Sequence, residues 1–183
     1  MRDAPSPRAG EQPRLLWWKV VAIWALFLVL HFSYETFPNA LFKIIGEDGE
    51  VTFFHMKMLF FAYVFVTVVE FLVRRASLPS VQSFVFSRML IAVIYPWLTI
   101  TMWFAAEALG IHVPVIPWEI VYANVITVIG IYMAVRMEEL FAETSFRSSL
   151  RLLIATTFAA AALSYVSFSL KVPMPFFTTP AGF

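Results

Sequence analysis

Histidines, carboxylates and a lysine stand near the ends of the apolar runs in a chain that is otherwise strongly apolar. His31 and Glu35 are four residues apart, so on a helix they lie on one face, with Tyr34 beside them. His55 and Lys57 stand near the start of a later apolar run. Such groups in apolar surroundings could bind a metal, carry a proton or hold a polar ligand.

More ionisable residues stand where the following apolar runs end or begin. If these runs are helices that alternate in direction across a membrane, all of these residues come to the same end. We therefore predict a polar cluster near the outer leaflet, formed by His31, Tyr34, Glu35, His55, Lys57, Glu107, His112, Glu119 and Tyr122.

Three interpretations of this predicted cluster remain open. The first is a divalent metal site with His31, Glu35 and His55 as ligands, although the sequence lacks a paired His-x-x-x-His motif. The second is a pocket for a lipid headgroup, a proton or a small ion, in which Lys57 pairs with Glu35. The third is structural, with hydrogen bonds that tie the helix ends together.

The composition indicates a membrane protein. Of the 183 residues, 61% are hydrophobic and only 14% are charged, which is too little polar surface for a soluble domain of this length. The net charge is +1 and the basic residues are scattered, so nothing favours a nucleic-acid partner. Cysteine is absent, which excludes disulfides and thiolate metal sites.

Five apolar runs are long enough, at roughly 20 residues each, to cross a bilayer as helices. We predict an all-α bundle of five transmembrane helices within residues 15–170, a disordered tail at 1–14 and an extended tail at 171–183. The expected helices and connections are spans at about 15–37, 51–73, 84–109, 118–136 and 150–170, a short amphipathic turn within 39–50 and a solvated connection at 137–149.

Orientation follows from the basic residues, which gather at cytoplasmic ends of membrane helices. With a cytoplasmic N-terminus and an outer C-terminus, 10 of the 13 lysines and arginines lie inside. We interpret Lys19 as an interfacial anchor and Glu70 as the partner of Arg74 one turn later. The predicted location is the inner membrane of a prokaryote, with multiple passes.

Small residues indicate where helices approach one another. Gly130 and Ala134 lie four residues apart in the fourth span, and the fifth span is rich in alanine. Side chains of this size let two membrane helices pack closely. Pro96, near the middle of the third span, predicts a kink because proline removes a backbone donor.

Several motifs resemble those of one family. The stretches LHFSYE at 30–35, HMKMLFF at 55–61 and FSLKVPMPFFTTPAGF at 168–183 resemble motifs of domain-of-unknown-function family 6512, a group of small prokaryotic polytopic membrane proteins. The resemblance covers nearly the whole chain and implies a five-helix bundle, with signature positions at His31, Tyr34, Glu35, His55, Lys57 and Glu70. It implies no activity. Phe53-Phe54 departs from the family's Trp-Glu, which favours a binding role over an enzymatic one.

The leading functional hypothesis is a non-enzymatic binding or accessory subunit. Its expected partners are membrane lipids, and either further copies of itself or the other subunits of a respiratory or photosynthetic complex. One alternative is a metal-dependent membrane hydrolase that uses His31, Glu35 and His55. The other alternative is a small ion or proton transporter that acts as an oligomer.

Overall fold

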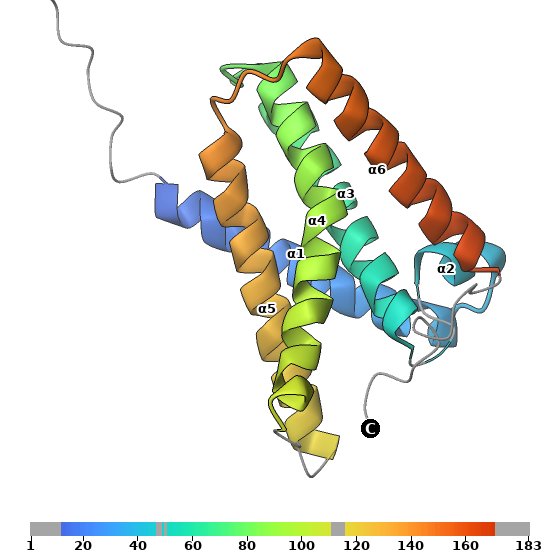
Figure 1. Cartoon of the computed structure of the whole chain (residues 1–183). Coiled ribbons are helices and arrows are strands. Elements are labelled where there is room, and N and C mark those ends of the chain that lie inside the picture. Colours follow the sequence, from blue (N-terminus) through green and yellow to red (C-terminus); the bar gives the residue numbers. More distant parts are fainter. Residues whose placement is uncertain (1–11, 47–48, 50, 111–115, 171–183) are drawn as a thin grey trace, which may run out of the picture.

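The protein's structure, a computed structural model, describes residues 12–46, 49, 51–110 and 116–170. All the elements in this part of the chain are helices: α1 (Gln12–Thr36), α2 (Ala40–Ile45), α3 (Thr52–Arg74), α4 (Val81–Ala108), α5 (Ile116–Phe141) and α6 (Ser148–Phe168) (Figure 1). All except the short α2 are long and apolar enough to cross a membrane. The predicted all-α bundle with five spans is confirmed.

The ends of the chain differ in part from the prediction. Because α1 begins at Gln12, residues 12–14 belong to this helix rather than to an N-terminal tail. The rest of that predicted tail, and the tail expected at 171–183, lie outside the described residues. The short turn after the first span is the helix α2, whose first turn is capped by the Asn39 side chain through two backbone N–H groups.

The end of α5 contradicts the sequence prediction. The helix continues to Phe141, so residues 137–141 are helical and do not belong to a solvated connection. Glu138 lies in this extension with an exposed fraction of only 3%. Other helices satisfy its charge in place of water, as described below.

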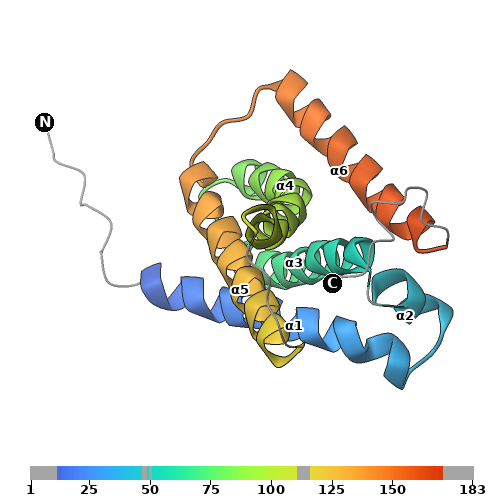
Figure 2. The same ribbon diagram turned by 60° about the horizontal axis from the view of Figure 1, so that its bottom comes forward.

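Consecutive long helices run in opposite directions, with α4 between α3, α5 and α6, and with α1 oblique to α5 (Figures 1 and 2). The bundle therefore has two ends. We call one the arginine end, defined by Arg74, Arg88 and Arg136. We call the other the histidine end, defined by His31 and His55.

The predicted close contact of small residues occurs between α4 and α5. A Cβ atom added to Gly130 would lie 2.1 Å from the Thr99 hydroxyl oxygen, and Ala134 is fully buried. The absence of a side chain at Gly130 thus lets the two helices meet. The helix α4 continues through Pro96.

The helix α6 packs against α4, and aromatic rings also join it to α3. Only Ile154 and Tyr165 of this helix are buried. Its contacts with α3 are made by rings, with the Tyr165 centroid 5.0 Å from that of Phe60 and the Phe158 centroid 5.4 Å from it. Ala159 lies exposed, whereas Ala161 and Ala162 are partly buried against the core of the bundle.

Candidate functional site

A cavity of about 460 Å³, which we call the histidine cavity, lies at the histidine end between α1, α3, α4 and α5. Three residues of the predicted polar cluster line it, namely His31, His55 and Glu119. Thr99 of α4 and Asn124 of α5 add polar groups that the sequence analysis did not select. Four helices thus converge on one partly polar space.

Aromatic rings form one wall of the histidine cavity. The imidazole centroids of His31 and His55 are 5.5 Å apart, so the structure brings these two residues together across α1 and α3. The His55 ring also lies 5.5 Å from the Trp103 ring of α4, edge to face. Phe27 lies 6.2 Å from the His31 ring. One nitrogen of His55 is 3.2 Å from the Val51 carbonyl oxygen, one turn earlier in the chain.

Two other polar side chains of the cavity are held by local hydrogen bonds. The Asn124 amide accepts from the Trp24 indole at 3.0 Å and donates to the Ile120 carbonyl at 2.9 Å. The Thr99 hydroxyl donates to the Tyr95 carbonyl at 2.9 Å. These bonds fix the wall, and the two histidines provide its most versatile hydrogen-bonding groups.

Among the described residues of the predicted cluster, Tyr34, Glu35, Lys57 and Tyr122 do not line this cavity. Tyr34 is half-buried and Glu35 is exposed in the last turns of α1. The Tyr122 hydroxyl donates to the Trp103 carbonyl at 2.9 Å, which ties α5 to α4. The Glu107 side chain and the whole of His112 lie outside the described residues.

The predicted metal site is not assembled. Within the described part of the chain, no three His, Cys, Asp or Glu side chains lie close enough together to hold a metal ion. His31 faces His55, but Glu35 is one turn nearer the end of α1, where its side chain is exposed. The hypothesis of a His31, Glu35 and His55 ligand set is therefore wrong.

The predicted ion pair between Lys57 and Glu35 is also wrong. Lys57 follows His55 by two residues, which is about 200° around a helix, so the two side chains leave α3 on opposite sides. The Lys57 ammonium donates to the Lys43 carbonyl at 2.9 Å and to the Ser169 hydroxyl at 3.2 Å. Lys57 is fully buried and joins α3 to α2 and to the residue after α6.

A second group of polar residues lies at the arginine end, where no site was predicted. We call it the charge cluster: Lys19, Tyr63, Glu70, Arg74, Arg88 and Glu138. Lys19 and both glutamates have exposed fractions of only 3%. The Lys19 ammonium contacts the Glu70 carboxylate and lies 2.7 Å from both carboxylate oxygens of Glu138. The interpretation of Lys19 as an interfacial anchor is therefore wrong.

The charge cluster joins four helices. Glu138 of α5 also accepts from the Tyr63 hydroxyl at 2.6 Å and lies 3.2 Å from the Arg88 guanidinium. Glu70 pairs with Arg74 at 2.6 Å, as predicted, in addition to its contact with Lys19. Three cations thus face two carboxylates, and each charge has a partner of opposite sign.

The two sites suit different tasks. The charge cluster is densely paired, so its first effect is to hold α1, α3, α4 and α5 together. The histidine cavity has room for a ligand, and pockets between helices of a bundle are common places for ligands to bind. Comparison of the chain with protein-family models, curated proteins and solved structures gives no match.

Proposed function

We propose that the protein is a membrane-embedded binding or accessory subunit that takes a small, lipid-soluble ring compound into the histidine cavity. The observation that carries this proposal is the convergence of His31, His55 and Glu119 on a space of about 460 Å³ between membrane spans. Small-molecule sites have volumes of roughly 300–1,000 Å³ and combine apolar walls with a few polar groups.

The chemistry of the wall selects the class of ligand. The rings of Phe27, Trp103 and the two histidines favour a flat ring that can stack or meet them edge to face. An imidazole can donate or accept a hydrogen bond according to its protonation. This property suits a ring oxygen that is either a carbonyl or a hydroxyl, as in a quinone and its quinol.

Binding of decylubiquinone and its quinol to the purified protein in detergent tests this proposal. We expect binding that weakens about tenfold in His31→Phe and in His55→Phe, because each variant keeps a ring but loses a hydrogen bond worth about 1.4 kcal/mol. Equilibrium dialysis provides the dissociation constants, and circular dichroism checks that each variant is folded.

Thr101→Val is the matched control for the histidine variants. Thr101 is exposed on α4, two residues from the cavity residue Thr99, and it bonds only to the Trp97 carbonyl within its own helix. Its substitution should leave the affinity unchanged. Absence of binding by quinone and quinol, or equal affinity in both histidine variants and the native protein, would refute the proposal.

The membrane setting of this proposal follows the charge distribution. Arginines gather at the arginine end of the bundle, which supports a cytoplasmic location for that end and for the N-terminus in a prokaryotic inner membrane. The helix α6 buries only Ile154 and Tyr165 within the chain. Its remaining apolar surface is available to lipids, to a second copy or to other subunits of a respiratory or photosynthetic complex.

A second candidate function, proton or small-ion transport, is favoured by two buried tyrosines. The ring centroids of Tyr63 and Tyr95 are 5.3 Å apart. Thr99 of the histidine cavity donates to the Tyr95 carbonyl, and Tyr63 donates to Glu138 of the charge cluster. The Tyr95 hydroxyl donates to the Leu59 carbonyl at 2.6 Å, so the two tyrosine rings lie between the two sites, and a proton would need a water molecule or a rotated hydroxyl to pass from one ring to the other.

Proton flux into proteoliposomes that contain a pH-sensitive dye tests the transport candidate. We expect flux above that of protein-free vesicles and loss of the excess in Tyr63→Phe, because phenylalanine removes the hydroxyl that reaches Glu138. Tyr132→Phe is the control, since Tyr132 is exposed on α5. Flux equal to that of empty vesicles would exclude transport of protons by this chain alone.

A further inference from the structure

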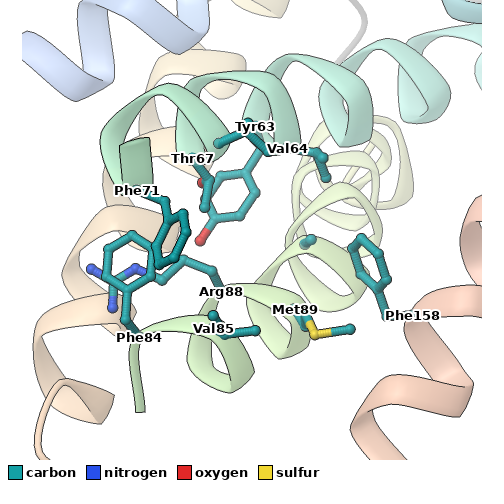
Figure 3. Close-up of a pocket in the computed structure, with 11 residues that line it drawn as sticks. Tyr63, Val64, Thr67, Phe71, Phe84, Val85, Arg88, Met89 and Phe158 are labelled. Atoms are coloured by element: carbon teal, nitrogen blue, oxygen red, sulfur yellow. The ribbon is translucent and has the colours of Figure 1, made fainter. Parts of the chain in front are cut away.

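A second cavity of about 180 Å³, which we call the lateral cavity, lies between α3, α4 and α6. Figure 3 shows Tyr63 and Phe71 of α3, Val85 and Met89 of α4, and Phe158 of α6 around it. Arg88 and Thr67 also line the cavity, but their buried polar atoms do not reach its surface, which is formed by carbon and sulfur atoms. It is therefore suited to a hydrocarbon and not to a polar solute.

The lateral cavity lies within membrane spans. Its lining residues belong to the spans Thr52–Arg74, Val81–Ala105 and Ser148–Phe168. The hydrocarbon that surrounds such spans is the acyl chains of lipids. A lipid chain is therefore the apolar occupant that the setting supplies.

Two arginines follow the lining residues toward the arginine end. Arg75 is four residues after Phe71, which places it one turn further along the same side of α3, and it is exposed. Arg151 is seven residues before Phe158, or two turns along the same side of α6. Both positions lie beyond the apolar cavity, where a lipid headgroup would be.

The Arg151 side chain adds an independent observation. Its terminal nitrogen Nη2 donates to the Ser148 hydroxyl at 2.8 Å. Its Nε atom is buried and has no hydrogen-bond partner among the described residues. A buried donor without an acceptor is costly, and an anionic group beside Arg151 would satisfy it.

From this arrangement we propose that the lateral cavity holds one acyl chain of an anionic phospholipid, whose phosphate is bound by Arg75 and Arg151. The lipid would bridge α3 and α6, and its chain would contact Phe158. Arginine binds phosphate with paired donors of matching geometry. This inference does not depend on the ligand of the histidine cavity.

Native mass spectrometry of the protein with added dioleoyl-phosphatidylglycerol or dioleoyl-phosphatidylcholine tests the proposal. We expect selective retention of phosphatidylglycerol, reduced about fivefold for each arginine that is removed in Arg75→Gln and Arg151→Gln. Val64→Trp, which fills the cavity from α3, should reduce retention of the chain itself. Inorganic phosphate at the same ionic strength should not displace the lipid.

The control is Arg136→Gln at the same end of the bundle, because Arg136 pairs with Glu139 on the exposed side of α5. It should leave retention unchanged. Equal retention of both lipids, or equal loss in Arg136→Gln and Arg75→Gln, would overturn the anionic site. Displacement by phosphate, or full retention in a folded Val64→Trp variant, would overturn the role of the cavity.

Discussion

Replacing Glu138 by glutamine is expected to lower the free energy of unfolding by about 3–5 kcal/mol, because it removes one partner from a buried ion-pair network. Glu138 contacts Lys19, Arg88 and Tyr63. Glutamine keeps the shape of the side chain but carries no charge. The buried Lys19 and Arg88 and the partly exposed Arg74 would then face the single carboxylate of Glu70.

The neighbouring residue provides a matched control. Glu139 pairs with Arg136 on the same helix, but both side chains are substantially exposed, at 39% and 54%. Glu139→Gln should therefore cost less than about 1 kcal/mol. Titration with sodium dodecyl sulfate in mixed micelles, followed by circular dichroism, compares the two unfolding free energies.

A double variant separates charge from packing. Lys19→Met combined with Glu138→Gln removes one cation and one carboxylate, so the remaining charges are as balanced as in the native protein. We expect the double variant to be more stable than Glu138→Gln alone. If the effects of the two substitutions add, or if Glu139→Gln is as damaging as Glu138→Gln, the charge cluster does not act as described.

The spans could be predicted from the sequence because they depend on length and composition. The predicted spans 51–73 and 150–170 agree with the bounds of α3 and α6 to within two residues. The predicted end of α5 is too early because the sequence alone does not distinguish a buried glutamate, Glu138, from an exposed one, Glu139. Only the tertiary structure shows that one of them faces α1 and α3 while the other faces outward.

The candidate site could be predicted only to the extent that the depth of a residue in the membrane determines which residues lie near it. His31 and His55 occupy the same level of neighbouring helices, and they do meet. Depth in the membrane does not determine the direction in which a side chain leaves its helix. The predicted partner of Lys57 is therefore wrong. For the charge cluster, the available signal was Arg88, a charge inside the long apolar run of α4, which requires a buried counter-ion.

Gly130→Leu should produce the second large effect, at the closest contact of α4 and α5. A Cβ atom at this position would lie 2.1 Å from the Thr99 hydroxyl oxygen and 3.1 Å from the Thr99 Cβ and Cγ2 atoms. Overpacking of this kind costs about 1–3 kcal/mol or more, since side chains or the backbone must move. The same micelle titration measures the loss.

Two further variants test whether the contact with Thr99 is the cause. Gly130→Ala should be destabilising alone, and Thr99→Ala should relieve part of its cost because the nearest atom, the hydroxyl oxygen, is then absent. Ala105→Leu, at an exposed position of α4, should change stability little. Because Thr99 also lines the histidine cavity, a Gly130→Leu protein that remains folded should bind the quinone probe more weakly. Native stability in Gly130→Leu would show that α4 and α5 are further apart than described.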